Sequence, residues 1–306
     1  MKEYRLITVL GPTASGKTAF AAALAARLGS EVISGDSRQV YRRMDIGTGK
    51  DLADYIVDGL PVPYHLIDIC EPGEKYNVFR FQHDFHRVFA EICSRGKLPV
   101  LCGGSGLYIE SVLRGYEMPD VPPNPALRER LKDKSVGELA SMLAADKALH
   151  NTTDLDSPQR VIRAIEIEEF RRRRHSKHSN FPSVPSLNIC LLIGREQRWE
   201  RIGRRLRERL EQGLADEIRG LLDSGLSAES IMYYGLEYKF VTLYVTGALS
   251  LAEMLDRLET NIRQFAKRQM TWFRGMERRG CIIQWIDALM PVEEKVESVL
   301  HLLNQQ

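Results

Sequence analysis

The sequence predicts an α/β fold in which a mostly parallel sheet is flanked by helices and a small helical segment is inserted. Residues 11–18 read GPTASGKT, the full G-x-x-x-x-G-K-[ST] pattern of a phosphate-binding loop. Short apolar runs alternate with segments of helical spacing over the first part of the chain, as in parallel sheets. The alternation stops near residue 116, and an apolar run returns at 187–193. Together these observations indicate a phosphate-loop NTPase-like core with an insertion.

Two predicted elements flank the phosphate loop. Residues 6–10 (LITVL) are apolar and partly β-branched, which is typical of a buried strand. Residues 18–28 (TAFAAALAARL) are rich in alanine and leucine, which favours a helix. A chance match to the loop pattern would need neither neighbour, so this context supports a real phosphate site.

Three further strands are expected in the first third, at 31–34, 65–69 and 98–102, with a helix at 78–94. Because each strand is followed by a helix or a long connection, the strands should run parallel.

The ends of these strands should form one site. Gly11, Asp36 and Gly103 each follow a predicted strand. Ligands of open parallel sheets bind at the carboxyl ends of the strands, so we expect these three segments to line one cleft.

The segment 115–186 is predicted to be a helical insertion between two parts of the core, 1–114 and 187–306. It opens with a proline-rich connector at 118–125 and closes with a polar, exposed loop at 175–186. Its expected helices are 126–133, 135–145 and 157–174.

The last third of the chain is expected to be mainly helical. A short strand is predicted at 282–286, and a closing helix begins near Pro291.

The composition of the 306 residues is that of an ordinary globular protein, with 43% hydrophobic and 27% charged residues. No apolar run approaches the ~18 residues that a membrane span needs, and the first strand leaves no room for a signal peptide. We therefore expect a cytoplasmic protein that makes no membrane contact. The five cysteines lack metal-ligand spacing, which favours reduced thiols. Nothing in the sequence demands an oligomer, and we expect a monomer.

Arginine is concentrated in the second half of the chain, at 171–174, 195–209 and 263–279. Three basic clusters indicate a polyanion larger than a nucleotide. Each cluster also has a simpler explanation, because 171–174 could be a solvated loop and the other two could be the water-facing sides of helices.

The phosphate loop carries the groups that bind linked phosphates. Its glycines let backbone N–H groups point inward, the following helix adds positive potential, and Lys17 adds a cation. Thr18 offers a hydroxyl to a Mg²⁺ ion shared with the phosphates. The predicted phosphate-binding residues are Gly11, Pro12, Thr13, Ala14, Ser15, Gly16, Lys17 and Thr18.

The segment 34–41 (SGDSRQVY) reduces the number of reactions that a phosphate-loop protein of this kind could catalyse. It places the Asp36 carboxylate at the end of a strand, beside the phosphate site, and follows it with side chains suited to reading a base. Most phosphate-loop ATPases instead carry a metal-linked aspartate after a long apolar strand. If this chain were such an ATPase, Asp68, in HLIDI at 65–69, would have to be the metal-linked aspartate.

Eight segments carry a resemblance that extends over most of the chain. They are GPTASGKT at 11–18, SGDSRQVY at 34–41, MDIGTGK at 44–50, HLIDI at 65–69, GGSGLY at 103–108, DSPQRVIRAIE at 156–166, RERLEQGLADEI at 207–218 and RQFAKRQMTWFR at 263–274. In these the chain resembles the tRNA dimethylallyltransferase (tRNA isopentenyltransferase) family. The resemblance implies transfer of a dimethylallyl group from dimethylallyl diphosphate to N6 of the adenine immediately 3′ of the anticodon. The tRNAs concerned read codons that begin with U.

A carboxylate facing a phosphate loop suits that reaction. The exocyclic amine of adenine is a poor nucleophile because its lone pair is delocalised, so a base that accepts its proton would help, and Asp36 is the candidate. Lys17, the loop amides and Mg²⁺ would stabilise the charge on the departing diphosphate. The alternative for Asp36 is the cap of a turn or helix.

Arg201 and Arg205 lie four residues apart in a predicted helix and so share one face. By the resemblance, Arg205 is a second contact to the diphosphate, and its alternative is a surface arginine paired with glutamates. The predicted catalytic residues are therefore Asp36, Lys17, Thr18 and Arg205.

The resemblance also implies contacts to the anticodon stem-loop of tRNA. The target base must swing out of its stack to reach the cleft. Ser105 corresponds to a family hydroxyl near that base, and it also fits the N-cap of a helix starting at Gly106. Trp272 and Phe273 suit the core as well as they suit base stacking. The predicted tRNA-binding residues are Asp36, Ser37, Arg38, Gln39, Ser105, Gln159, Arg160, Arg163, Lys267 and Arg268.

The chain departs from the family pattern in places. The family's GTAKP-like segment is GTGKD at 47–51, its I-G-Y-[KR]-like segment is YYGLEYK at 233–239, and Gly35 and Ile262 replace the usual residues.

Three other functions compete with this interpretation. They are an adenylate isopentenyltransferase acting on free adenine nucleotide, a nucleotide-hydrolysing or kinase-type protein, and an RNA-binding module with a vestigial loop. The segments at 156–166 and 263–274 favour the tRNA enzyme over the first. The intact Lys17, Thr18 and Asp36 argue against the last.

Overall fold

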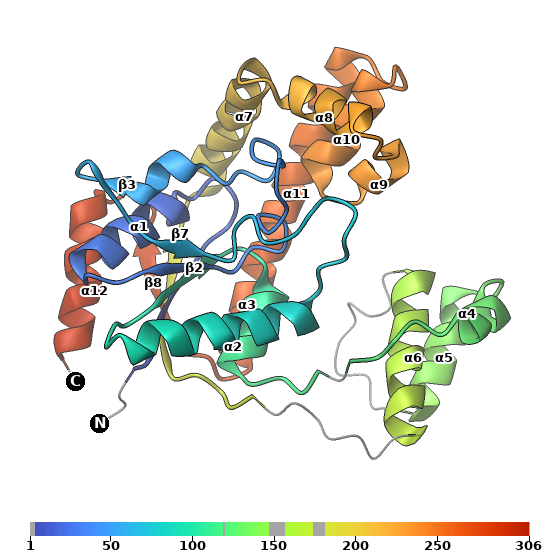
Figure 1. Ribbon diagram of the computed structural model, residues 1–306, viewed down its shortest axis with the longest axis horizontal. Helices are drawn as coiled ribbons and strands as arrows, with labels where there is room; N and C mark the ends of the chain where they lie inside the picture. Colours follow the sequence, from blue (N-terminus) through green and yellow to red (C-terminus); the bar gives the residue numbers. More distant parts are fainter. Residues whose placement is uncertain (1–3, 119, 147–156, 174–180, 306) are drawn as a thin grey trace. The chain divides into compact units, whose positions relative to one another are not determined.

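The computed structural model describes residues 4–118, 120–146, 157–173 and 181–305. The described residues divide into two compact units. One comprises Met1–Gly115 and Pro182–Gln306, and the other comprises Tyr116–Phe181. The first unit contains the sheet, and the second contains helices (Figure 1).

The larger unit is built on a six-stranded sheet in the order β5-β2-β6-β1-β7-β8. Its strands are β1 Leu6–Leu10, β2 Val32–Ser34, β5 Tyr64–His65, β6 Val100–Gly103, β7 Ser186–Leu192 and β8 Ile283–Asp287. All neighbouring pairs are parallel, as predicted. Since all carboxyl ends therefore lie at one edge, the segments that follow the strands meet there.

Helices cover both faces of this sheet because its central strands are apolar on both sides. Leu6 and Leu10 of β1 pack in one core cluster, and Ile7 and Val9 pack in the other. Helices α1 (Lys17–Arg27) and α12 (Val292–Asn304) cover the face with Ile7 and Val9. The opposite face is covered by α2 (Val78–Ser94), α3 (Gly106–Leu113) and α11 (Leu251–Arg278) (Figure 1).

The remaining elements of the larger unit are short, apart from α7. They are η1 Leu52–Tyr55, β3 Ile56–Val57, β4 Leu60–Pro61, α7 Arg195–Glu211, α8 Leu214–Asp223, α9 Ala228–Met232 and α10 Leu236–Val245. The helical character of the last third, the strand near 282–286 and the closing helix are confirmed. The hairpin of β3 and β4 was not predicted.

The smaller unit contains α4 (Pro125–Leu131), α5 (Val136–Asp146) and α6 (Pro158–Arg173), which lie close to the predicted helices. Its core is formed by leucine and β-branched side chains, Leu127, Leu131, Leu139, Leu143, Val161, Ile162 and Ile165. Residues 175–180 of the loop predicted at 175–186, together with Asp156 and Arg174, lie outside the described residues.

The strand predicted at 65–69 is wrong beyond its first residue. β5 ends at His65, and Leu66 and Asp68 have φ values of 62° and 56°, which turn the chain out of the sheet. The N–H of Ile69 donates to the carbonyl of Val40 at 2.8 Å. The Asp68 carboxylate accepts a hydrogen bond from the buried amine of Lys50. A local apolar pattern could not anticipate this long-range pairing.

Among the helices of the described residues, none is long and apolar enough to cross a membrane. All five cysteines are free.

The buried carboxylate of Glu31, just before β2, forms hydrogen bonds to residues of β5 and of the segment that leads into β6. Glu31 accepts from His65 (2.7 Å), Arg95 (2.7 and 3.2 Å) and Lys97 (2.8 Å). Burial alone would raise the pKa of Glu31, but these hydrogen bonds outweigh it and lower that pKa to about 2. The folded state therefore gains stability from ionised Glu31 above its unfolded pKa, and loses it as the pH falls towards 2.

We expect Glu31→Gln to lower the free energy of unfolding by about 2–3 kcal/mol at pH 7. Urea denaturation should show that the difference from wild type shrinks between pH 5 and pH 3. Glu297→Gln is the matched control, because Glu297 pairs with Arg27 on the surface at 3.4 Å and should change stability little. An equal effect at every pH would contradict the electrostatic role of Glu31.

Candidate active site

The phosphate loop leads from β1 into α1 in the expected geometry. Ala14 and Gly16 have φ values of 61° and 79°, and this left-handed turn points the backbone at the start of α1 inward. Gly16 is the N-cap of α1 and offers no side-chain cap, so the first amides of the helix remain available to an anion. A Cβ on Gly11 would lie 2.5 Å from Ser15 Oγ, which explains why a glycine stands there.

The loop opens into a cavity of about 740 Å³ in the larger unit. Residues from the phosphate loop, the segment after β2, the segment after β6 and helices α7 and α11 line it. The residues that line the cavity and were predicted as site residues from the sequence are Thr13, Ala14, Gly16, Lys17, Thr18, Asp36, Ser37, Arg38, Gln39, Ser105, Arg205 and Arg268. Of the other loop residues, Gly11, Pro12 and Ser15 are buried behind this surface.

The predicted meeting of three strand ends is confirmed. A Cβ on Gly103 would lie 2.6 Å from the carbonyl oxygen of Gly35, and one on Gly104 would lie 3.3 Å from that of Gly11. The backbones after β1, β2 and β6 are therefore packed directly against one another. This close approach requires a glycine at position 103.

Lys17 lies within this cavity beside the loop. Burial lowers the pKa of Lys17, and the nearby Cys102 and Asp36 act to raise it. Among the described residues, no carboxylate lies within ion-pair distance of the Lys17 amine, so its charge faces the cavity.

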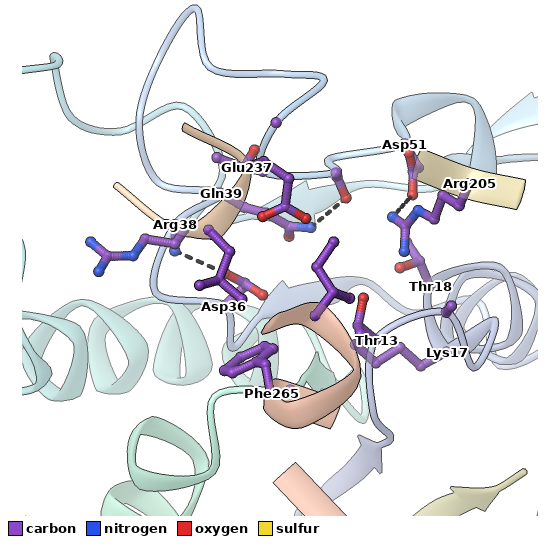
Figure 2. Close-up of a pocket in the computed structure, with 18 of the residues that line it drawn as sticks. Thr13, Lys17, Thr18, Asp36, Arg38, Gln39, Asp51, Arg205, Glu237 and Phe265 are labelled. Atoms are coloured by element: carbon purple, nitrogen blue, oxygen red, sulfur yellow. Dashed lines mark hydrogen bonds and ion pairs between the residues drawn. The ribbon is translucent and has the colours of Figure 1, made fainter. Parts of the chain in front are cut away.

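Asp36 faces the cavity and also caps a turn. Its Oδ1 accepts a hydrogen bond from the N–H of Arg38 at 2.8 Å, and its own N–H donates to Ser34 Oγ at 3.3 Å. The capping alternative is therefore confirmed for a turn, and Asp36 also lines the cavity, where its role as a base stays a prediction. Figure 2 shows Asp36 and Arg38 on one side of the cavity, with Lys17, Thr18 and Arg205 on the other.

Gln39 and Ser105 fix the wall around Asp36. Gln39 accepts from Ser34 Oγ at 2.8 Å and donates to the carbonyl of Gly49 at 2.9 Å. Ser105 stands at the N-cap position of α3, but its side chain caps no amide of that helix. Its hydroxyl instead accepts from the N–H of Ser37 at 3.1 Å. The capping alternative for the Ser105 side chain is therefore wrong.

Gln269 is a site residue that sequence reasoning missed. Its side chain is buried in the cavity wall, accepts from the N–H of Thr13 at 2.9 Å and donates to the carbonyl of Gly104 at 3.0 Å. One amide thus joins α11 to two of the loops that form the site. Its place in the RQFAKRQMTWFR segment was the available signal.

We expect Gln269→Leu to leave both backbone groups unpaired, which costs about 1–3 kcal/mol for each. Thermal unfolding should show a lower Tm, and inorganic diphosphate should bind more weakly because Thr13 is no longer held. Gln264→Leu, on the exposed side of α11, is the control and should leave both unchanged. An unaltered diphosphate affinity in Gln269→Leu would refute its role in holding the loop.

The arginines of α7 form the wall above the loop. Arg201 and Arg205 both line the cavity, so the predicted shared face is confirmed. Arg205 pairs with Asp51, and Arg209, one turn further on, is buried with Nη2 3.8 Å from the same carboxylate. Arg209 was not predicted, because a basic run alone does not show which side chain turns inward.

The smaller unit holds three of the residues predicted to contact tRNA. Gln159 and Arg160 are exposed on α6. Arg163 donates to Glu166 at 2.9 Å and to the carbonyl of Val121 at 2.7 Å. Burial would raise the pKa of Glu166, but its hydrogen bonds from arginines and a backbone amide lower it to about 2. Arg163 therefore has a structural task in this unit.

Burial and position distinguish the remaining candidate residues. Phe273 is fully buried in the core, whereas the half-buried Trp272 and the exposed Phe265 line the cavity. Lys267 is exposed and does not line it. Asp68 does not line the cavity either, so its position does not support the role of a metal-linked aspartate beside the phosphate site.

Thr18 is placed to share a hard cation with phosphates. Its hydroxyl lines the cavity and has no hydrogen-bond partner among the described residues, and hydroxyl and phosphate oxygens are ligands that Mg²⁺ accepts. Within the described residues, no group of three or more His, Cys, Asp or Glu side chains is placed to hold a metal ion.

A phosphate loop that faces a carboxylate across one cavity, on a parallel sheet, defines a phosphate-loop transferase type of site. An IPP transferase family model matches residues 39–276, and an isopentenyl transferase model matches residues 4–58.

The chain is similar to named relatives over its whole length. It is 61% identical to tRNA dimethylallyltransferase 1 of Parabacteroides distasonis, over 100% of both chains. It is 58% identical to tRNA dimethylallyltransferase 2 of Phocaeicola vulgatus, over 99% of both. The solved tRNA isopentenylpyrophosphate transferase of Bacillus halodurans superposes with a TM-score of 0.71 at 34% identity, covering 99% of this chain and 96% of that one. The chain belongs to the tRNA dimethylallyltransferase family.

Proposed function

We propose that this chain transfers the dimethylallyl group of dimethylallyl diphosphate to N6 of the adenine immediately 3′ of the anticodon, in tRNAs that read codons beginning with U. The observation that carries the proposal is the placement of Asp36 across one cavity from Lys17, Thr18 and Arg205 (Figure 2). A proton acceptor and a site for a leaving polyphosphate are the two parts that this transfer requires.

The reaction replaces one C–O bond by a C–N bond and moves one proton. The N6 amine forms a C–N bond to the allylic carbon as the C–O bond to diphosphate breaks, and the electron pair of that bond leaves with the diphosphate. An N6 proton passes to the Asp36 carboxylate. The hydrogen bond from the Arg38 N–H holds one oxygen of Asp36 in place. This anchoring orients the carboxylate towards the incoming base.

The departing diphosphate gathers negative charge, which positive groups must stabilise. Lys17, the loop amides and Arg205 are the candidates for this task. Mg²⁺, when bound through Thr18 and the phosphates, adds positive charge there. The partial burial of Lys17 and Thr18 strengthens these interactions, because less water screens them than at an exposed surface.

The rim of the cavity suits a purine that has swung out of its stack. Arg38 lies over the ring of Tyr233 at 5.0 Å, which holds its guanidinium at the rim. Ser37, Gln39 and Ser105 are the other candidates for base contacts. We also assign tRNA contacts to Arg268, which lines the cavity, and to Gln159, Arg160, Arg163 and Lys267, which do not line it. Arg163 in addition donates a hydrogen bond to Glu166 within its own unit.

We propose that the chain works as a monomer, since Asp36, Lys17, Thr18 and Arg205 of the same chain together supply the proton acceptor and the phosphate-binding groups. We place it in the cytoplasm, since tRNA is the substrate.

A transfer assay tests the proposal. Radiolabelled dimethylallyl diphosphate and Mg²⁺ would be incubated with the protein and either an unmodified tRNA with an adenine-rich anticodon loop or free AMP. Label on the tRNA is the expected result. Label on AMP would assign the chain to the nucleotide-prenylating enzymes, and label on neither, with ATP hydrolysed, would reject prenyl transfer.

Binding of tRNA should weaken steeply with salt, because basic side chains release counterions from the phosphates. Filter binding at about 50 and about 200 mM salt should show a loss of at least tenfold if only a few phosphates are contacted. Affinity that does not change with salt would contradict a basic tRNA surface.

A further inference from the structure

An ionic cluster in the cavity wall contains three residues that the proposed reaction does not use, in addition to Arg205. It joins Asp51 to Arg205 and Arg209 of α7 and to Glu237 of α10. Arg209 Nη2 lies 3.8 Å from Asp51 Oδ2, and Arg209 Nη1 lies 3.5 Å from Glu237 Oε1. All four residues line the cavity, and Figure 2 shows Asp51 beside Arg205.

The carboxylate of Asp51 forms ion pairs with the two arginines and accepts no hydrogen bond from the backbone of η1. Asp51 is the N-cap of η1, a position where aspartate normally accepts a backbone hydrogen bond, yet it makes none. Its φ of 45° is in the left-handed region, which Asp and Asn tolerate better than most residues. This conformation turns the side chain towards α7.

The loop that carries Asp51 is tightly anchored. The next residue towards the N-terminus, Lys50, is 1% exposed and donates to the carbonyl of Tyr41 at 2.8 Å and to Asp45 at 2.5 Å. Glu217 accepts from three successive amides of the same loop, at 2.7–3.1 Å. A charge held by so many contacts is fixed in position and does not simply swing away.

The absence of a side chain at Gly49 leaves room for the two arginines. Its φ is +64°, and a Cβ there would overlap the guanidinium of Arg209 and meet Arg205 Nη2 at 2.6 Å. Both arginines therefore pack against bare backbone, next to Asp51.

The formal charges of the cluster cancel, since two arginines face two carboxylates. Arg209 is buried, and its Nη2 has no hydrogen-bond partner among the described residues. Burial and Arg205 lower the pKa of Arg209, whereas Glu237 and Asp51 raise it. The carboxylates thus keep a buried cation charged and at the same time reduce the positive potential that the arginines offer to a ligand.

We propose that Asp51 is a specificity-determining residue, a fixed counter-charge that limits how much negative charge the phosphate site accepts. It favours a diphosphate over a triphosphate, because Coulomb repulsion from Asp51 grows with the charge of the ligand. This inference rests on the proposed function in assigning the phosphates of the substrate to Lys17 and Arg205.

Calorimetric titration with inorganic phosphate, diphosphate and tripolyphosphate tests it with Asp51→Asn. Asparagine keeps the left-handed turn and the shape of the side chain but removes the charge. We expect diphosphate to bind about fivefold more tightly than to wild type, with a smaller gain for phosphate and a larger one for tripolyphosphate. Asp58→Asn, at an exposed turn that also has a left-handed φ, is the matched control and should show no gain.

A second variant shows whether the effect passes through Arg205. In an Arg205→Met background, Asp51→Asn should give a clearly smaller gain. A gain that is equal for all three ligands, or a loss of affinity, would overturn the inference. If wild type transfers the prenyl group but Asp51→Asn leaves the three affinities unchanged, only this inference fails. If wild type binds no diphosphate at all, the proposed function fails with it.

Discussion

Replacement of Asp36 by asparagine is expected to reduce the rate of prenyl transfer by about 10²–10⁴-fold and to leave tRNA binding intact. Asparagine Oδ1 can still accept the hydrogen bond from the Arg38 N–H, so the turn after β2 should keep its shape. What is lost is the negative charge of the carboxylate and, with it, the ability to take a proton from N6. Single-turnover transfer and filter binding of tRNA, measured on the same preparation, separate these two effects.

Asp58→Asn is the control for Asp36→Asn, because it removes the same charge from an exposed turn that does not line the cavity. Its transfer rate should equal that of wild type. Undiminished turnover by Asp36→Asn would show that N6 loses its proton without this carboxylate, and the base would have to be sought elsewhere.

Lys17→Met is expected to lower the transfer rate by about 10²–10³-fold, since the developing charge on diphosphate loses its nearest cation. Methionine fills much of the same space, and Lys17 has no ion pair among the described residues that its removal would break. The thermal stability should therefore change little. Rapid-quench measurement of transfer, together with titration of inorganic diphosphate, gives the effects on rate and on binding.

The buried position of Lys17 makes its outcome more informative. Burial lowers the pKa of Lys17, so binding of diphosphate to the free enzyme should weaken at a lower pH than for an exposed lysine. The Met variant should lose that pH dependence. Lys75→Met, at an exposed loop position, is the control and should behave as wild type. A Met variant with a normal rate would remove Lys17 from the mechanism.

Local patterns predicted the elements that carry the phosphate site. The loop, its strand and its helix are continuous in sequence, so apolar periodicity and the glycine spacing defined them directly. Asp36 could be placed because the carboxyl ends of parallel strands share an edge. Each of these inferences needed only one segment of chain, or one rule about parallel sheets.

The parts that sequence did not predict depend on distant partners. β5 stops at His65 because the Lys50 amine and the carbonyl of Val40 draw the following residues away. Gln269 joins the phosphate loop from a helix near the other end of the chain, and an amide side chain carries no pattern of its own. The inward turn of Arg209 depends on Asp51 and Glu237, two residues that no spacing rule connects.

The strand order of the sheet also decides when this protein can first work. Within the sheet, Thr8 of β1 lies beside Leu101 of β6 and Asn188 of β7. The strand that is synthesised among the first is therefore flanked on its second side only after most of the chain has left the ribosome. Arg205 and Gln269 emerge later still. A nascent chain consequently carries its phosphate loop for most of its synthesis without the wall that completes the site, and contacts of such long range are slow to form. We expect the cavity to gain its full lining only after Gln269 of α11 has emerged from the ribosome.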